Sequence, residues 1–555
     1  MPANASRDML SGTNVKAFLR LMNVRFDTIG VLLLIGIAVG LTAWLVQSPI
    51  YWIQEDGYYY LGIAAQLAHG AGSTFDGVNL TNGYQPLWLL ALVPLLGISH
   101  SPENALQLCI LLQGVCVAAT LVSFYRTARL MLECAFALFA TFIWLAFTIG
   151  ESFKGMEFAV HALGITLVAY IYLRYFTPSL PSHRRPYLAL GLVASLTVLA
   201  RLDTIGLAII LGVTLCMRAA CIGALRLHLI AAFALPILVT VTAYAAVNLV
   251  LFSSPVPVSG LVKEAWAQQL LQEDPMLQLY GWIGARVMNL FWTFEDLPNA
   301  FPLYMTVGTF GAAAVSLIGA LAPAHSIRGI TLRRTLHPLA PFIAYSLLNF
   351  LFYAITLYRN LSWAPWYYVI QPWLTALFAG FGLNLLWKWG AARWDMHFRL
   401  STRVGVTIFL TALILSPLIA PITYISFIES AEQSGYRYNP LYEGAMWARA
   451  HLPPDAVIGA WNAGTIGFLS ERRTVNLDGV VNSIDFFERG RGDLCRYWRV
   501  QGITYLVDVF EGDQALSVVS PYPAYAQCTG QLQPVWSDAR NFVSWRLQVY
   551  RVNLQ

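Results

Sequence analysis

The run I-G-V-L-L-L-I-G-I-A-V-G-L-T-A-W-L-V, from Ile29 to Val46, contains no charged side chain, and the acid pair Glu55-Asp56 follows it closely. An uncharged apolar run of about 20 residues predicts a helix that crosses a membrane. Comparable runs recur along the 555 residues, of which 57% are hydrophobic and 11% charged, with a mean hydropathy of +0.58. Soluble proteins carry about a quarter charged residues. The sequence therefore predicts an α-helical multi-pass membrane protein.

The apolar runs predict about eleven membrane spans. They are Ile29–Val46, Ala105–Phe124, Cys134–Gly150, Phe158–Leu173, Tyr187–Ala200, Ile205–Met217, Leu229–Phe252, Phe301–Leu321, Pro341–Leu357, Trp366–Leu386 and Val404–Ile425. The run Pro86–Ile98 is too short to cross about 30 Å of hydrocarbon, so it is expected in the interface or as a re-entrant segment. Tyr187–Ala200 and Ile205–Met217 are expected to form a hairpin, because one merged helix would invert every later loop.

The distribution of basic residues predicts the orientation, since cytoplasmic loops carry most of the lysines and arginines. One set of alternate segments, which includes the N-terminus, holds most of the basic residues that precede the tail. The other set holds only Lys154, Arg201, Lys263, Arg286 and Arg359. We therefore expect a cytoplasmic N-terminus, an external first loop over residues 47–104 and an external C-terminal tail.

The composition changes after the last apolar run, which divides the chain into a transmembrane part, residues 1–425, and a tail, residues 426–555. The tail alternates β-rich and helical stretches, which predicts a small external α/β domain. These stretches are Leu441–His451, Ala456–Trp461, Ile503–Val509 and Trp545–Val552. Cys495 and Cys528 are the only cysteines of the tail. An external compartment would permit a disulfide between them, although the sequence gives no distance.

The first external loop holds the candidate catalytic residue, Asp56. A carboxylate at the membrane surface is often only a solvated loop residue, but the surrounding sequence favours a site. Tyr58-Tyr59-Tyr60 is expected at head-group depth, and Leu61–Ala68 is expected to lie on the membrane as an amphipathic stretch. The glycines that follow would let the backbone approach a ligand closely. We interpret Asp56 as a general base that accepts a proton from a hydroxyl group.

Basic residues on the external side run against the charge bias and are candidates for ligand binding. Arg201 lies at the tip of the expected hairpin beside Asp203, where it would either bind a phosphate or be neutralised by that acid. Lys263 follows a span directly and would either reach a lipid phosphate or extend to the interface. Lys154 and Glu157 are expected to pair with each other. No nucleic-acid motif is present.

Several motifs resemble those of bacterial polytopic glycosyltransferases of the GT-C superfamily, which are distantly similar to protein mannosyltransferases and to the aminoarabinose transferase of lipid A. The motifs are E-D-G-Y-Y-Y-L-G-I-A, T-F-D-G-V-N-L-T-N-G-Y-Q-P-L-W, K-G-M-E-F-A-V-H-A-L, L-A-R-L-D-T, P-V-S-G-L-V-K and W-N-A-G-T-I-G-F-L-S-E-R-R-T-V-N-L-D-G. The resemblance covers nearly the whole chain, and it implies a GT-C-like fold.

The resemblance also implies an enzyme that takes a monosaccharide from a polyprenyl-phosphate donor on the external face and inverts the anomeric carbon. The acid of the family's first external loop falls on Asp56, and the basic residues that would bind the donor phosphate are Arg201 and Lys263. Many members have a second Asp where this chain has Glu55, so a divalent ion shared by Glu55 and Asp56, Mg or Mn, is an open expectation. Relatives often have His at the position of Gln85, so that position receives no catalytic role.

The resemblance thus implies an inverting hexosyl- or pentosyltransferase of the bacterial inner membrane that acts in cell-envelope glycan synthesis. The acceptor is a hydroxyl group on a glycan, a lipid or a protein. Besides Asp56, Arg201 and Lys263, the residues expected to bind substrate are Glu55, Tyr59, Asp76, Asn82, Tyr84, Glu157 and Asp203. The alternatives are a transporter or flippase of a lipid-linked sugar and a non-catalytic scaffold. The concentration of polar residues in external loops and the absence of repeated halves speak against a transporter.

Overall fold

A computed structural model describes residues 12–177, 179–273, 314, 337–356, 365–393, 439–511, 528, 532–538 and 545–553. Among these residues, six helices are long and apolar enough to cross a membrane by length and composition. They are Asp27–Leu45, Pro102–Arg129, Cys134–Ser152, Phe158–Phe176, Leu202–Cys221 and Leu227–Phe252. The predicted class, a helical multi-pass membrane protein, is confirmed. The predicted span Val404–Ile425 and all of Phe301–Leu321 except residue 314 lie outside the described residues, so about eleven spans stays a prediction.

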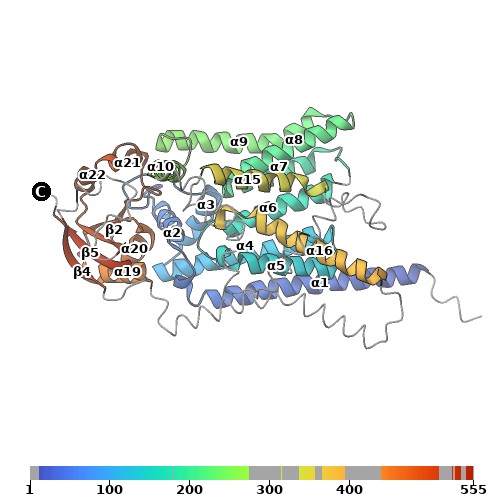
Figure 1. Cartoon of the computed structure of the whole chain (residues 1–555), viewed down its shortest axis with the longest axis horizontal. Helices are drawn as coiled ribbons and strands as arrows, with labels where there is room; N and C mark the ends of the chain where they lie inside the picture. Colours follow the sequence, from blue (N-terminus) through green and yellow to red (C-terminus); the bar gives the residue numbers. More distant parts are fainter. Residues whose placement is uncertain are drawn as a thin grey trace, which may run out of the picture.

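The long helices run side by side along the long axis of the molecule, and the C-terminal domain caps one end of them (Figure 1). The elements of this bundle are α1 (Gly12–Leu45), α4 (Pro102–Arg129), α5 (Cys134–Ser152), α6 (Phe158–Ile171) with η2 (Tyr172–Phe176), α7 (Arg184–Ala200), α8 (Ile205–Cys221), α9 (Leu227–Phe252), α15 (Ala340–Thr356) and α16 (Ile370–Arg393). The predicted hairpin is present, because the helix breaks at Arg201, whose backbone is extended, before η3 (Leu202–Thr204) and α8.

Close packing holds the bundle together, because lipid tails are as apolar as the helices themselves. A β-carbon at Gly191 of α7 would collide with the carbonyl oxygen of Phe233 in α9, so these two helices lie in direct backbone contact. In the centre, Phe124 stacks on Trp144 at 6.1 Å and meets Trp373 edge-on at 5.5 Å between ring centroids. The outer faces stay apolar: Val250 on α9 is 81% exposed, as expected for a surface covered by lipid.

Three short helices lie at the end of the bundle that carries the C-terminal domain: α2 (Glu55–Ala68), α3 (Pro86–Gly97) and α10 (Val258–Glu273). The first loop was expected to place Leu61–Ala68 on the membrane surface and the three tyrosines at head-group depth. Both expectations are wrong. Helix α2 packs between α3 and α20 (Ala463–Ser470) of the C-terminal domain, and Tyr58, Tyr59 and Tyr60 are buried. The apolar side chains of α2 therefore fill a protein interior.

The C-terminal domain contains a five-stranded sheet of order β2-β1-β3-β5-β4. Its elements are α19 (Pro440–His451), β1 (Val457–Ala460), α20, β2 (Arg473–Asn476), α21 (Ile484–Glu488), α22 (Leu494–Gln501), β3 (Tyr505–Glu511), β4 (Leu532–Ser537) and β5 (Trp545–Val552). Strand β1 pairs in parallel with β2 and β3, whereas β5 pairs antiparallel with β3 and β4. Cys495 and Cys528 form a disulfide with a Cα–Cα distance of 5.5 Å.

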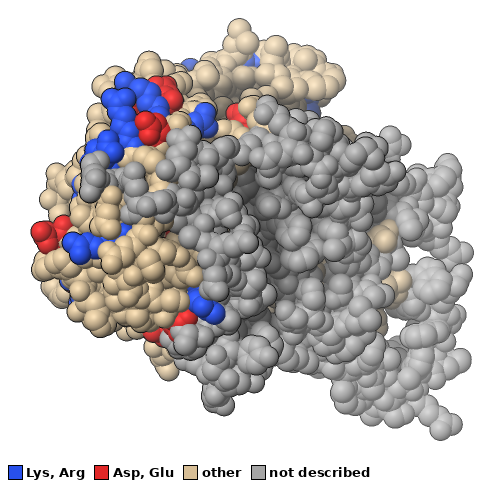
Figure 2. All heavy atoms as spheres, turned by 60° about the vertical axis from the view of Figure 1, so that its left-hand side comes forward, with Lys and Arg blue, Asp and Glu red and all other residues tan. Residues whose placement is uncertain are grey.

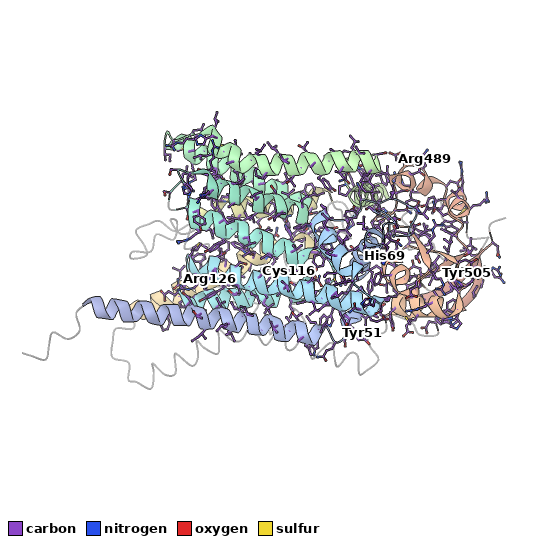
Figure 3. All side chains as sticks on the ribbon, turned by 180° about the vertical axis from the view of Figure 1, so that it is seen from behind. Tyr51, His69, Cys116, Arg126, Arg489 and Tyr505 are labelled. Atoms are coloured by element: carbon purple, nitrogen blue, oxygen red, sulfur yellow. A yellow bond between two sulfur atoms is a disulfide. The ribbon has the colours of Figure 1, made fainter. Side chains whose placement is uncertain are left out.

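Figure 2 shows the end of the molecule that carries the C-terminal domain. Most charged side chains on its described surface belong to that domain. The helical bundle contributes few, because its described outer faces are apolar. Figure 3 shows the two ends of the molecule: Arg126 of α4 lies toward the far end of the bundle, while Tyr505 and Arg489 lie in the C-terminal domain. The molecule thus separates a polar end from an apolar helical body.

Candidate active site

A cavity of about 510 Å³, partly open to solvent, lies where the bundle meets the C-terminal domain. Its lining comes from the first loop, the start of α6, the α7–α8 break, α10, η5 (Pro365–Tyr367) and the turn after β2. The lining residues are Asp56, Tyr59, Tyr60, Ile63, Gly83, Tyr84, Gln85, Met156, Glu157, Arg201, Ser259, Lys263, Trp366, Tyr367, Val480 and Val481. Acids, cations, tyrosines and a tryptophan thus converge on one space at the end of the membrane helices.

Asp56 reaches this cavity from the first turn of α2. The amide groups of a first helical turn have no partner within the helix, and the helix dipole there favours a negative charge. The start of α2 is seated firmly, since the Gln54 amide donates to the Lys154 carbonyl at 3.1 Å. A β-carbon at Gly57 would collide with that same carbonyl oxygen. The backbone around Asp56 therefore has a fixed position against the segment before α6.

Glu55 points away from the cavity and binds the C-terminal domain. Its carboxylate accepts the Gly464 amide, the Thr465 amide at 3.1 Å and the Thr465 hydroxyl at 2.6 Å. Burial raises the pKa of Glu55 to about 7, although the hydrogen bonds from Thr465 and Gly464 oppose this rise. The expected sharing of a divalent ion by Glu55 and Asp56 does not fit these contacts, because the oxygens of Glu55 already hold α20. Among the described residues, no group of three or more His, Cys, Asp or Glu side chains is placed to hold a metal.

Arg201 is buried between two carboxylates. It donates to Glu157 at 2.5 Å and to Asp203 at 3.2 Å. A third bond, of 2.7 Å, goes to the Tyr353 hydroxyl. The side chains of Arg201 and Glu157 are each 3% exposed. The positive charge of Arg201 is thus compensated within the protein before any ligand arrives.

Glu157 completes this network on the cavity side. Its second oxygen accepts the Tyr60 hydroxyl at 2.8 Å, and that hydroxyl accepts the Gln85 amide at 3.0 Å. The expected pairing of Lys154 with Glu157 is wrong, because Lys154 pairs with Glu151 instead. The network fixes the floor of the cavity through charge-assisted hydrogen bonds.

Lys263 differs from Arg201 in having no acid as its direct partner. Its ammonium donates to the Tyr367 hydroxyl at 2.9 Å and lies 5.6 Å from the centre of that ring. Within the described part of the chain, no carboxylate lies within ion-pair distance of it. Burial lowers the pKa of Lys263, but Tyr367 and Asp56 outweigh it, so the pKa lies above its usual value. A positive charge is therefore available on the cavity wall.

The structure divides the ten predicted site residues into two groups. Those that line the cavity are Asp56, Tyr59, Tyr84, Glu157, Arg201 and Lys263. The other four, Glu55, Asp76, Asn82 and Asp203, do not line it. Asp203 binds Arg201 and accepts from Asn349 at 3.0 Å, so it supports the cavity from behind.

Asp76 and Asn82 tie the first loop to other parts of the protein, and their expected role in substrate binding stays a prediction. Asp76 accepts the Asn79 amide at 2.7 Å and forms a salt bridge of 3.1 Å with Arg473 in β2. Asn82 donates to Asn248 of α9 at 2.7 Å and accepts the Val258 amide of α10 at 2.9 Å. Both side chains are buried, and their hydrogen bonds to protein groups take the place of hydrogen bonds to water.

One acid near the cavity escaped the sequence analysis. Asp478 follows β2 in the motif N-L-D-G, and its carboxylate accepts the Val480 amide at 2.7 Å. Burial raises the pKa of Asp478 to about 7, and the charge of Asp56 adds to the rise while Lys263 opposes it. Asp56, Lys263 and Asp478 are therefore close enough to influence one another. The motif itself was visible in the sequence, but nothing in it indicated proximity to the first loop.

Solved structures share this architecture. ArnT from Cupriavidus metallidurans bound to undecaprenyl phosphate matches with a TM-score of 0.52 and 14% identity, covering 94% of this chain and 97% of that chain. Its apo state matches with a TM-score of 0.54 and 14% identity over 94% and 98% of the two chains. The apo oligosaccharyltransferase of Archaeoglobus fulgidus matches with a TM-score of 0.51 and 13% identity over 86% and 69%. The chain has the GT-C fold.

The GT-C fold confirms the resemblance seen in the motifs at the level of architecture. A family model described as a domain of unknown function, DUF8728, matches residues 427–552. This range contains the described elements of the C-terminal domain, from α19 to β5. A comparison of the sequence with curated proteins gives no match. At these identities the likeness concerns the fold alone, so the chemistry must be argued from the cavity.

Proposed function

We propose that this chain is an inverting glycosyltransferase that moves a monosaccharide from a polyprenyl-phosphate donor to an acceptor hydroxyl. The observation that carries the proposal is that Asp56 and Lys263 face one cavity at the polar end of a membrane bundle. A carboxylate supplies a base for a hydroxyl, and an ammonium supplies a partner for a phosphate. The solved ArnT structure, which has the same fold, holds undecaprenyl phosphate.

In the proposed reaction, the acceptor oxygen attacks the anomeric carbon of the donor sugar while Asp56 takes the hydroxyl proton. The bond between the anomeric carbon and the phosphate oxygen breaks, and the configuration inverts because attack and departure occur on opposite faces. The departing phosphate gains negative charge. A positive charge already in place stabilises that charge best, because it needs no reorganisation during the reaction.

The two predicted phosphate-binding cations have different roles in this proposal. Lys263, which has no acid as direct partner in the described residues, binds the donor phosphate. Arg201 holds Glu157 and Asp203 and keeps the cavity wall in shape. The centre of the Tyr367 ring lies 5.0 Å from the Arg201 guanidinium and 5.6 Å from the Lys263 ammonium. The phosphate would approach the Lys263 ammonium.

We place the cavity on the external face of the bacterial inner membrane, with a cytoplasmic N-terminus. The excess of basic residues in alternate loops supports this orientation. Arg126, one of the residues expected in the cytoplasm, lies at the opposite end of the bundle from the C-terminal domain (Figure 3). The disulfide between Cys495 and Cys528 suits an oxidising compartment.

The test uses purified full-length protein in lipid nanodiscs and a panel of synthetic donors that carry hexoses or pentoses on polyprenyl phosphate. An extract of cell-envelope glycans and lipids supplies the acceptor hydroxyls. Nucleotide sugars with the same monosaccharides are the control. We expect release of polyprenyl phosphate from at least one lipid donor and none from the nucleotide sugars. Proton NMR of the product should show an anomeric configuration opposite to that of the donor. Turnover of nucleotide sugars, or retention of configuration, would overturn the proposal.

A further inference from the structure

The helix that carries Asp56 is held by the C-terminal domain. Helix α20 has no capping bond from its own N-cap side chain, Asn462. The cap comes instead from Glu55 of α2, which accepts hydrogen bonds from Gly464 and Thr465. Asn462 donates to Asp508 at 2.9 Å. A carboxylate at a helix N-terminus satisfies amides that have no partner in the helix, and here it also joins two parts of the protein that are distant in sequence.

Tyr59 makes a second connection one turn further along α2. Its hydroxyl donates to the Trp461 carbonyl at 3.1 Å and accepts the Ala463 amide at 3.3 Å and the Asn476 side chain at 3.1 Å. Residues four apart lie on the same face of a helix, so Glu55 and Tyr59 bind α20 and its neighbours together. Asp56 is the next residue after Glu55 and therefore points in another direction, into the cavity.

The two surfaces approach so closely that glycines are needed at the contact. A β-carbon at Gly464 would collide with the carbonyl oxygen of Glu55, and one at Gly83 would collide with that of Val480. Val480 and its neighbour Val481 line the cavity. The turn that carries them is braced by Asn476, which accepts the Gly479 amide at 2.9 Å. The C-terminal domain thus contacts the first loop at two places, Glu55 and Gly83, and its residues Val480 and Val481 line the cavity that Asp56 also lines.

We propose that the C-terminal domain is a working part of the active site, in which Glu55 is the positioning residue that fixes Asp56 through α20. The turn 476–482 forms one wall of the same cavity. This inference rests on the proposed role of Asp56 as the base. It assigns a role to the domain matched at residues 427–552, which has no described function. A base displaced by about 1 Å can lose roughly 100-fold in rate, so the anchoring of α2 bears directly on turnover.

The test compares full-length variants on the two sides of the anchor. Glu55→Ala removes the carboxylate from α2, and Thr465→Val removes the hydroxyl donor from α20 while leaving α2 unchanged. Glu55→Gln retains an acceptor oxygen and serves as the conservative replacement. Glu488→Gln, at an exposed acid of the same domain, is the control. The measurements are turnover of the donor panel, the Kd for undecaprenyl phosphate, and hydrogen exchange of the amides at the start of α20.

We expect Glu55→Ala to lower kcat by about 10- to 100-fold, with the Kd for undecaprenyl phosphate within about 2-fold of wild type, because Lys263 is untouched. Thr465→Val should lower kcat less, and Glu55→Gln should recover part of the loss. In Glu55→Ala and Thr465→Val the amides of Gly464 and Thr465 should exchange faster. Glu488→Gln should match wild type in all three measurements.

Two results would overturn the inference. One is wild-type turnover and unchanged exchange in both Glu55→Ala and Thr465→Val. The other is a loss of undecaprenyl phosphate binding that parallels the loss of turnover in Glu55→Ala, which would make Glu55 a substrate ligand. If Glu55→Ala does not fold, Thr465→Val and Glu55→Gln decide by the same criteria. Failure of the proposed function looks different, since wild type itself would then release no polyprenyl phosphate from the donor panel. Failure of the role of Asp56 as the base would appear as full turnover in Asp56→Asn.

Discussion

Replacing Lys263 by Met should weaken binding of the donor phosphate more than any other single loss of charge at the cavity. The replacement keeps an unbranched side chain of similar length and removes only the positive charge. The Lys263 ammonium faces the cavity beside Tyr367. Within the described residues it forms no salt bridge, so a phosphate would be its first direct anionic partner.

The size of the effect follows from simple electrostatics. Two unit charges about 4 Å apart interact by about 4 kcal/mol at the effective dielectric constant of about 20 found near protein surfaces. The Lys263 side chain is only partly buried, and salt and water reduce the interaction further. We therefore expect a loss of about 2 kcal/mol, which corresponds to roughly a 30-fold higher Kd for undecaprenyl phosphate.

The assay is equilibrium binding of labelled undecaprenyl phosphate to the protein in nanodiscs. Lys263→Arg keeps a positive charge and should lose less affinity than Lys263→Met. Arg489→Met removes an exposed charge from the C-terminal domain and should leave the Kd unchanged. Because the pKa of Lys263 lies above its usual value, the charge persists through neutral pH. Lys263→Met should therefore bind undecaprenyl phosphate more weakly than wild type at every pH from about pH 6 to pH 9. A Kd within twofold of wild type in Lys263→Met would refute the assignment.

Three further outcomes are expected. Arg201→Ala should lower the thermal unfolding temperature, since about 3 kcal/mol or more is lost when buried acids are left without their cation; an unchanged unfolding temperature would contradict the structural role of Arg201. Burial raises the pKa of Asp478 from 3.8 to about 7, so this acid makes wild type lose stability as the pH rises between these values, and Asp478→Asn lacks this contribution. The unfolding temperature of wild type minus that of Asp478→Asn should therefore fall from pH 4 to pH 8, and a flat difference would count against the burial of this acid. Cys495→Ser should lower the free energy of unfolding by about 2 to 4 kcal/mol when measured without reductant. As a control, wild type in reductant should lose the same amount, because its disulfide is then also absent.

The general architecture could be predicted because it depends on local composition. Uncharged runs of sufficient length form membrane helices wherever they occur, and the break at Arg201 follows from the charge of the loops on either side. The tail differs in composition, and the three predicted β-rich stretches overlap β1, β3 and β5, whereas β2 and β4 were not predicted. The position of Asp56 was also accessible, because an acid that follows a span directly must lie near the membrane surface.

The partners of individual side chains could not be predicted, because they depend on contacts between distant segments. Glu55 looked like a companion of Asp56, yet adjacent residues of a helix point in different directions, and Glu55 binds Thr465 instead. Asp76 looked like a ligand in a glycine-rich loop, but Arg473 of β2 neutralises it. In both cases the partner lies in the C-terminal domain, and the sequence gives no information about how that domain is placed on the first loop.

The same reason explains the error about the tyrosines of α2. Aromatic residues beside a membrane span are commonly found at the lipid interface, and no local feature distinguishes those that a second domain covers. Tyr59 is buried because Trp461, Ala463 and Asn476 bind its hydroxyl. The Tyr59 hydroxyl is therefore part of a contact within the protein.

The central claim is that the Asp56 carboxylate activates the acceptor, and single-turnover transfer by Asp56→Asn tests it most directly. The variant protein is first saturated with donor, and the rate of polyprenyl phosphate release is measured after acceptor is added. Loss of a general base should slow this step by about 100-fold or more. The affinity of Asp56→Asn for undecaprenyl phosphate should equal that of wild type. The control is Glu103→Gln, at an exposed acid in the first turn of α4, which should behave as wild type. A single-turnover rate equal to that of wild type would contradict the account.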